Sequence, residues 1–290
     1  MTKNKNKSIS GLVFDTCNMI FMVLFSFSIL YPFLYILSVS FTDNPASINP
    51  YNLVPQKFIL TSYIKVLSSE YIIIGYMNTI VRVALGTIIT TFVCILTAYP
   101  LSKKFLPDRK FFTAFMVFTM FFSGGLIPMY ILIKSLKYIN TVWALVIPSA
   151  IPTFSMLIIR NYFMTIPDSL EESAKIDGAN DFFILFSIVV PLSLPILATT
   201  VLWTIVGHWN AWFDAMLYIT NSRKQVLQAI LRQIVIVGTM DQLEFEAHMY
   251  ASPESLKAAT IIVGTLPIIM VYPFVQKYFI KGIMIGSLKG

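Results

Sequence analysis

The stretch EESAKIDGAND, residues 171–181, is a compact polar segment between two long apolar runs. It carries four of the fourteen acidic residues of the chain. Pro167 precedes it, and Pro191 and Pro195 follow it, so residues that cannot donate a backbone hydrogen bond stand on both sides. A polar segment this short, kept between such apolar runs, has to serve either the fold or a partner.

The composition of the whole chain predicts a membrane protein. Apolar residues make up 57% and charged residues 12%, whereas soluble domains have about 45–50% and about 25%. Six stretches are long enough to span a bilayer. They are residues 12–41, 71–101, 111–133, 139–159, 184–206 and 258–280. We therefore expect an all-α polytopic protein with six transmembrane helices.

Lysine and arginine positions predict the orientation. With the N-terminus in the cytoplasm, the inner segments hold twelve of these residues and the outer segments eight. The densest cluster, SKKFLPDRK at residues 102–110, then lies in a short inner loop, where the positive-inside rule is strongest. Both termini are expected in the cytoplasm, and the segment at 171–181 with them. The net charge of +7 follows from these flanking residues, and no basic block with interleaved aromatics predicts nucleic-acid binding.

The local sequence around residues 168–181 predicts a short helix followed by a turn. Asp168 is a candidate N-cap, with Glu171 three residues later as in a capping box, and Gly178 suits a left-handed stop. Asn180 or Asp181 can cap the next helix. One face of the first helix carries mostly small or polar residues: Leu170, Ser173, Ala174 and Asp177. These features alone are also those of an ordinary capped loop.

A longer pattern resembles a known family. Glu172-Ser173-Ala174, then Gly178, then Ile188-Val189-Val190-Pro191 has the spacing of the cytoplasmic signature of ABC importer permeases. PLSLPILATT, FFSGGLIPMYILIKSL, HWNAWFDAMLYIT and the terminal YPFVQKYFIKGIMIGSLKG resemble the sugar-uptake permeases of the maltose and oligosaccharide type. The resemblance covers nearly the whole chain and implies the fold of a type I ABC importer permease.

The resemblance also implies a docking role for the quoted segment. In that family it forms a coupling helix that enters a groove of a cytoplasmic ATPase. The implied coupling residues are Glu172, Ser173, Ala174, Asp177, Gly178 and Pro191. The implied partners are two ATPase subunits, a second related permease, an extracytoplasmic sugar-binding protein and the lipid of a bacterial inner membrane. The sequence has no G-x-x-x-x-G-K-[ST] motif, so we expect no enzyme activity and no cofactor in this chain, with ATP and Mg bound by the partner ATPase.

Polar and aromatic residues near the membrane are candidates for a sugar path. They are Asn78, Trp209, Asn210, Trp212, Asp214 and Tyr218. Tryptophan and tyrosine are also enriched at every membrane interface, so an interface belt is the alternative. Only Asp15 and Arg82 are charged within the predicted spans. The two histidines, His208 and His248, are expected to make ordinary polar contacts, and no metal site is predicted around them or around Cys17 and Cys94.

The chain divides into three predicted parts. Residues 1–70 hold the N-terminal tail, the first span and the first outer loop, residues 71–280 hold a five-helix core, and residues 281–290 form a cytoplasmic tail. Within the core lie the coupling loop 167–182 and an outer loop 207–257, in which residues 226–235 have the apolar spacing of an amphipathic helix at a membrane surface or on a partner. A stand-alone secondary transporter or channel is the alternative function. A membrane hydrolase has less support, because its motifs are absent.

Overall fold

The computed structural model describes residues 9–42, 53–55, 57–237 and 252–287. Throughout these ranges the regular elements are helices, as predicted. Lys3, Lys5, Lys7, His248 and most of the second half of the predicted outer loop lie outside the described residues. The chain forms two compact units, residues 1–69 with 239–263 and residues 70–238 with 264–290.

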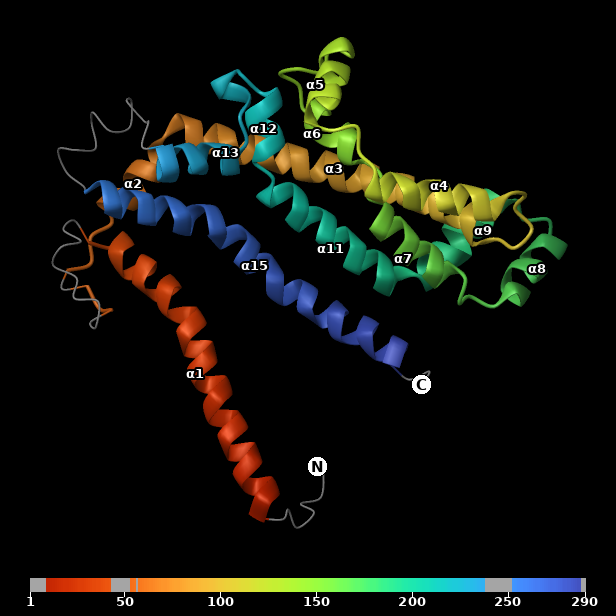
Figure 1. The fold of residues 1–290 in the computed structure, drawn as a ribbon, viewed down its shortest axis with the longest axis horizontal. Coiled ribbons are helices and arrows are strands. Elements are labelled where there is room, and N and C mark those ends of the chain that lie inside the picture. Colours follow the sequence, from red (N-terminus) through yellow and green to blue (C-terminus); the bar gives the residue numbers. More distant parts are fainter. Residues whose placement is uncertain (1–8, 43–52, 56, 238–251, 288–290) are drawn as a thin grey trace. The chain divides into compact units, whose positions relative to one another are not determined.

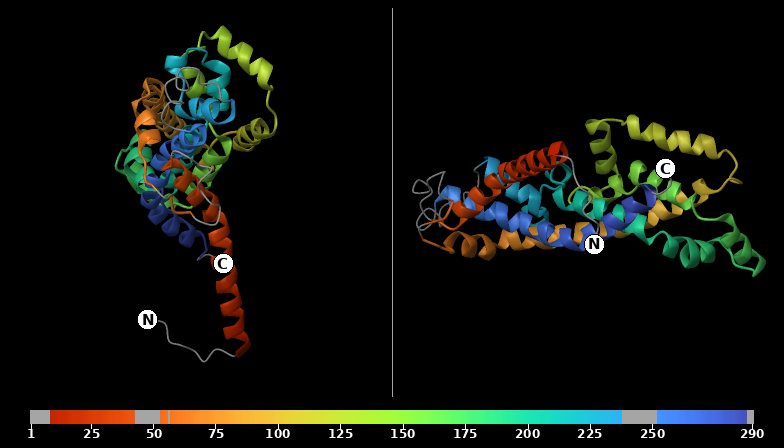
Figure 2. Two further views of the ribbon diagram at one scale, coloured as in Figure 1. Left: turned by 90° about the vertical axis from the view of Figure 1, so that its left-hand side faces the viewer. Right: turned by 90° about the horizontal axis from the view of Figure 1, so that it is seen from below.

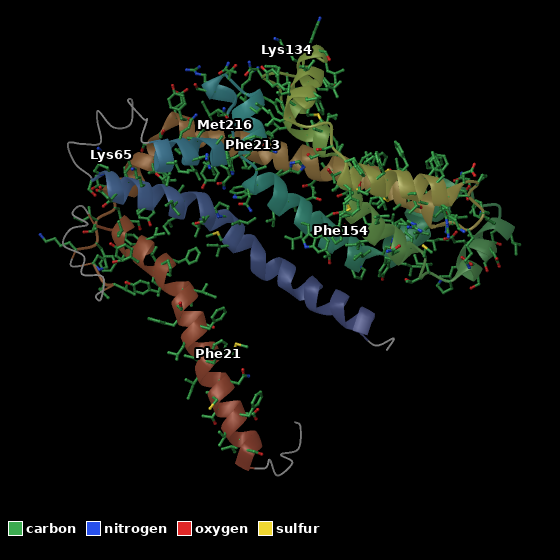
Figure 3. All side chains as sticks on the ribbon, in the orientation of Figure 1. Phe21, Lys65, Lys134, Phe154, Phe213 and Met216 are labelled. Atoms are coloured by element: carbon green, nitrogen blue, oxygen red, sulfur yellow. The ribbon has the colours of Figure 1, made fainter. Side chains whose placement is uncertain are left out.

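The first unit is built on α1 (Ile9–Ser40), α2 (Thr61–Ser68) and the start of α15 (Pro253–Ser287). The end of α1 is where these elements meet. The Ser40 hydroxyl lies 2.6 Å from the Tyr63 hydroxyl, and the Ser255 hydroxyl donates to the Thr42 carbonyl. Most of α1 has its side chains exposed, including Phe21, which is labelled in Figure 3. An apolar helix with exposed side chains is suited to lipid.

The second unit is organised around α3 (Glu70–Ser102), against which α6 (Trp143–Val146), α7 (Thr153–Phe163), α11 (Leu194–Asn210) and α13 (Leu227–Arg232) pack. Figure 1 shows α8 (Asp168–Ile176) near the C-terminal end of α3 and α12 (Phe213–Tyr218) near its N-terminal half. This unit contains two clusters of buried apolar side chains. One contains Tyr99, Phe163 and Ile184, and the other contains Leu145, Tyr218 and Val226.

Three helices are long and apolar enough to cross a membrane: α1, α3 and α15. The other predicted spans are bent pairs. α4 (Arg109–Phe121) and α5 (Leu126–Ser135) meet at 108°, which both panels of Figure 2 make visible. Helix α6 with the turn η2 (Ile147–Ser149) meets α7 at 49°. Counting each pair as one span gives up to six spans in the described part of the chain, the predicted number.

The third bend changes the prediction for the segment after α8. Helix α9 (Asp181–Ile184), the π-helical turn η3 (Leu185–Val189) and α10 (Val190–Leu192) form one arm, and α11 forms the other at 84°. The predicted span at 184–206 is therefore not one straight helix. The chain bends at Ser193, and Pro191 and Pro195 lie on either side of this residue. Each proline removes a backbone donor from the helix, which favours a bend here.

The glycine pair at 124–125 explains the sharpest bend. Gly125 precedes α5 with φ +87°, a backbone conformation that favours glycine over residues with a side chain. The prediction of a continuous helix over 111–133 is wrong at this position. Apolar content alone predicted a span, but the glycine conformation turns the chain through more than a right angle.

The predicted outer loop at 207–257 also contains more helix than expected. Helix α13 is followed by the π-helical turn η5 (Gln233–Val237), with the turn η4 (Ser222–Lys224) before it. Leu227, Ile230 and Ile234 are buried within the second unit. A methyl group at Gly75 of α3 would lie 3.2 Å from the Leu227 Cα, so α13 packs closely on α3. The prediction of a helix at a membrane surface or on a partner is therefore wrong, since its apolar face is covered by this chain.

Candidate functional site

The start of α8 differs from the predicted cap. Pro167 occupies the N-cap position with extended backbone, and no side chain caps the helix. Asp168 is thus the first helical residue, and its carboxylate lies 3.4 Å from Lys104 Nζ instead of capping. The predicted capping box of Asp168 and Glu171 is wrong because the helix begins one residue earlier than expected. The acidic first turn still favours the helix through its dipole.

The end of α8 matches the prediction. Gly178 has φ +83°, and the Ala179 amide donates to the Ala174 carbonyl at 2.9 Å. The Gly178 amide donates to the Lys175 carbonyl at 3.0 Å, which completes a Schellman motif. Asn180 then caps α9, its side-chain oxygen accepting from the Phe183 amide at 2.8 Å. A methyl group at Gly178 would meet no atom within 4 Å, so the backbone conformation, and not crowding, favours glycine here.

A buried ion pair ties α8 to α3. Lys103 follows the last residue of α3, and its ammonium group contacts the carboxylate of Glu171. Each side chain is only 10% exposed. The same ammonium lies 4.6 Å from the centre of the Tyr99 ring. The sequence did not predict this pair, because its local patterns placed Lys103 only in the inner cluster and Glu171 only in a cap.

The opposite side of α8 faces solvent. Glu172, Ser173 and Asp177 are exposed, and among the described residues the Glu172 side chain has no hydrogen bond or ion pair. The Ser173 hydroxyl donates to the Ser169 carbonyl at 2.9 Å. Ile176 is 87% exposed, an unusual value for isoleucine. This face leaves acidic and apolar groups together without a partner in the described chain.

Ala174 and Pro191 do not belong to that exposed face. Ala174 is half-buried and packs against the cluster around Phe163 and Ile184. Pro191 lies in α10, next to the bend at Ser193. Of the six predicted coupling residues, only Glu172, Ser173, Asp177 and Gly178 lie together on the exposed surface of the α8 turn. A cavity of about 510 Å³ beside them is lined by residues that include Lys104, Phe163, Glu172 and Lys175.

A second buried cluster of charged side chains lies between α3 and the segment that follows α11. Arg82 of α3 is 2% exposed and contacts both carboxylate oxygens of Asp214. One terminal nitrogen of Arg82 also donates to the Ala211 carbonyl at 3.1 Å, and its Nε donates to His208 Nδ1 at 3.5 Å. Arg82 therefore joins α3 to the break between α11 and α12. A buried guanidinium needs such pairing, because an uncompensated charge in the interior is strongly unfavourable.

Close helix packing places His208 in this cluster. A methyl group on Gly86 of α3 would lie 2.3 Å from His208 Nε2, so the imidazole occupies the space that a larger residue would take. His208 is buried and makes a polar contact with Arg82, which confirms the prediction of an ordinary polar contact for this residue. The sequence did not reveal its partner, since Arg82 and His208 are far apart along the chain.

The predicted path residues do not gather around one cavity. Asn78 uses its amide nitrogen to donate to the carbonyls of Arg223 at 3.1 Å and Gln225 at 2.9 Å, so it holds the loop before α13. Trp209 is buried, with its ring centre 6.2 Å from that of Tyr76. Asn210 is exposed. Asp214 alone among the six lines the cavity beside Arg82.

Trp212 and Tyr218 also make internal contacts. The guanidinium of Arg232 lies 3.7 Å from the centre of the Trp212 ring. Tyr218 is buried and stacks on Tyr130 with 6.2 Å between ring centres. Burial, with a smaller effect from the Asp214 carboxylate, raises the pKa of Tyr218, so this phenol stays neutral at physiological pH. The contacts of both rings are those of packed side chains.

The cavity beside Arg82 has a volume of about 300 Å³. Hydroxyl groups from four helical elements, α3, η2, α7 and α11, line it, together with the indole of Trp203. Trp203 stacks on Phe154, with 6.1 Å between ring centres, and Phe154 is labelled in Figure 3. The buried hydroxyl of Thr90 has no hydrogen-bond partner in the described structure, although an unpaired buried hydroxyl costs about 1–3 kcal/mol.

The sequence did contain a signal for this cavity. Thr200, Thr204, Gly207, His208 and Ala211 recur at helical spacing within an apolar run, which indicates a polar face on α11. The predicted sugar path relied instead on the aromatic stretch after residue 208 and did not use this face of α11. Among the described residues, no group of three or more histidine, cysteine or acidic side chains has the arrangement of a metal site.

The described part of the chain is helical and has up to six spans, which is the architecture of the membrane subunit of a transporter. The family of binding-protein-dependent transport system inner membrane components matches residues 1–285, and the chain belongs to this family. It is therefore a transport permease of an inner membrane, and the family is not one of catalytic subunits.

Several relatives align over nearly their full length. The chain is 40% identical to the polygalacturonan/rhamnogalacturonan transport system permease YtcP of Bacillus subtilis, covering 99% of this chain and 100% of the relative. It is 29% identical to the trehalose/maltose transport system permease MalG of Thermococcus litoralis, covering 92% and 94%. A chain in the crystal structure of a bacterial ABC transporter that imports the acidic polysaccharide alginate superposes with a TM-score of 0.90 at 32% identity, covering 95% and 100%.

Proposed function

We propose that this chain is one of two membrane subunits of an ATP-driven importer of oligosaccharides, and that α8 couples it to a cytoplasmic ATPase. The observation that carries the proposal is the build of α8. It is anchored on one side by the buried Lys103–Glu171 pair and leaves Glu172, Ser173 and Asp177 exposed on the other. A helix held firmly by its own chain, with a free acidic face, is suited to docking in a partner.

The docking helix has two connections to the membrane helices. The Lys103–Glu171 pair leads to α3, and the Schellman turn at Gly178 leads through α9 to the bend at Ser193. A rigid-body movement of α8 would therefore reach both α3 and α11. Pro191 supports this role by its place beside the bend, and Ala174 by its packing against the cluster that contains Ile184.

We also propose an orientation in the membrane and a role for each of three parts of the chain. Both termini lie in the cytoplasm, so residues 168–181 face the ATPase. Residues 1–70 form the first span and its flanks, residues 71–280 the transport core, and residues 281–290 the inner tail. Single cysteines in a background without Cys17 and Cys94 test this orientation. An impermeant thiol reagent applied from outside should label a cysteine at Lys137 and spare one at Asp108, and the reverse pattern would contradict the assignment.

The names of the relatives support the proposed substrate, and the name of the family supports a binding protein as a partner. Permeases named for polygalacturonan, rhamnogalacturonan, trehalose and maltose transport support an oligosaccharide as the cargo. An extracytoplasmic sugar-binding protein delivers it, and a second, related permease completes the path as a heterodimer. Two ATPase subunits bind ATP and Mg, and this chain holds no cofactor of its own.

Transport in a defined system tests the proposal. The chain is purified with its ATPase, its second permease and its binding protein, and is reconstituted in liposomes with labelled oligosaccharides. Import should require ATP and all four components. Uptake by this chain alone, driven by an ion gradient without ATP, would establish the stand-alone transporter in its place.

A further inference from the structure

We propose that the cavity beside Arg82 is a saccharide subsite that binds the hydroxyl groups of one sugar ring stacked on Trp203. This inference rests on the proposed function and names where in this chain the cargo binds. The cavity lies entirely within the second unit, between α3, α7 and α11. Its volume of about 300 Å³ is at the lower end of the range of about 300–1,000 Å³ for ligand pockets.

An unpaired buried hydroxyl group points to a polar ligand. The Thr90 side chain is 2% exposed, and its hydroxyl has no hydrogen-bond partner among the described residues. Ser155 on α7 is buried as well, and it lines the same cavity. The Thr204 hydroxyl donates to the Thr200 carbonyl at 2.9 Å and keeps its lone pairs free to accept. Buried polar groups normally have partners, so a ligand with several hydroxyl groups would complete this set.

An aromatic ring supplies the apolar contact that a sugar ring needs. Trp203 is 38% exposed and lines the cavity, while Phe154 stacks on it and fixes its orientation. The faces of a pyranose ring carry C–H groups that pack on an aromatic surface, and its edges carry the hydroxyl groups. An indole next to four hydroxyl-bearing side chains therefore matches both parts of a sugar ring.

The charges at the cavity provide no contact for a carboxylate. Arg82 contacts both oxygens of Asp214, so the two charges compensate each other. The Arg82 Nε and one terminal nitrogen already donate to His208 and Ala211. The Asp214 side chain is 30% exposed, so it can accept from a sugar hydroxyl but would repel the carboxylate of a uronate. The subsite thus binds hydroxyl groups and leaves any acidic group of the cargo outside.

Photo-crosslinking in the complete importer tests the subsite. Maltotriose and trigalacturonate, each with the same diazirine group, are presented by the binding protein to the reconstituted complex. Labelled peptides are mapped by mass spectrometry. Both probes should label residues 149–156 and 200–210. Trp203→Ala should reduce this labelling about tenfold, Trp203→Phe should retain most of it, and Thr90→Val should reduce it about threefold.

Matched controls separate the outcomes. Trp143 is 42% exposed and lies outside the cavity, so Trp143→Ala should label like the parent protein. The amount of assembled complex and its import are measured in the same preparations. If the Trp203→Ala complex imports sugar and is labelled as strongly as the parent complex, the subsite alone is overturned. Labels confined to other segments overturn it as well. Labelling by trigalacturonate but not maltotriose overturns the hydroxyl-based recognition. A parent complex that imports neither probe overturns the proposed function and the subsite with it.

Discussion

Two buried ion pairs hold the second unit together, and they are built differently. Arg82 makes hydrogen bonds to Asp214, Ala211 and His208 from a planar guanidinium with fixed geometry. Lys103 meets Glu171 through one ammonium group at the end of a flexible chain, with the Tyr99 ring beside it. Arginine is suited to a rigid joint between several groups, whereas lysine is a point charge that keeps its contact as the angle changes.

The two ion pairs also differ in where they lie in the unit. Arg82 lies within α3 and fixes the break between α11 and α12, beside the proposed sugar subsite. Lys103 lies beyond the end of α3 and holds a short helix that ends in turns. We infer that the first pair maintains the architecture of the unit, while the second allows α8 to tilt without detaching.

The largest expected effect is on the Arg82 joint. Arg82→Met leaves the Asp214 carboxylate without its partner, which should destabilise the protein by about 3 kcal/mol, the lower end for a broken buried pair because Asp214 is partly exposed. Arg82→Lys should restore little, since lysine cannot make the same set of contacts. Thermal unfolding in detergent and the yield of assembled complex measure the effect. A normal melting temperature for Arg82→Lys would show that the fixed geometry is unimportant.

A smaller effect is expected at Gly86. Gly86→Ala places a methyl group against the His208 ring, and overpacking of this kind costs about 1–3 kcal/mol. The same measurement applies, with Gly207→Ala as a control, because a methyl group at Gly207 meets no atom within 4 Å. Equal stability of the two variants would mean that the His208 ring moves away freely.

The lysine pair should affect coupling more than stability. Glu171→Gln keeps a side-chain oxygen that can accept from the Lys103 ammonium, so the complex should still assemble. ATP-dependent import should fall about tenfold, because α8 loses its charged anchor on α3. The exchanged pair Lys103→Glu with Glu171→Lys should recover part of the import lost in either single exchange, as a double-mutant cycle would reveal. Import at the parent level in Glu171→Gln would remove the distinction between the two pairs.

The smallest effect on stability is expected on the exposed face of α8. Glu172→Lys should change the free energy of unfolding by less than about 0.5 kcal/mol, as exposed substitutions usually do. It should nevertheless weaken binding of the ATPase and reduce stimulated hydrolysis, with Glu172→Gln giving an intermediate result. Unchanged copurification with the ATPase in both variants would assign the face to another partner.

The sequence predicted features that depend on local chemistry or on composition. The number of spans followed from apolar length, and the turn at Gly178 followed from a glycine where the helix had to stop. The Lys103–Glu171 and Arg82–Asp214 contacts join positions 68 and 132 residues apart, so no local pattern could pair them. The path prediction relied on aromatic residues, and Trp209 and Tyr218 are instead packed in the interior.

The two sides of α8 should evolve under different constraints. Lys103 and Glu171 contact each other, so a change of charge at one position is tolerated mainly together with the opposite change at the other. Glu172, Ser173 and Asp177 touch little of their own chain and are free to follow changes on an ATPase surface. Among homologous permeases, the buried pair should therefore covary within the chain, while the exposed residues covary with the sequence of the ATPase that each permease uses.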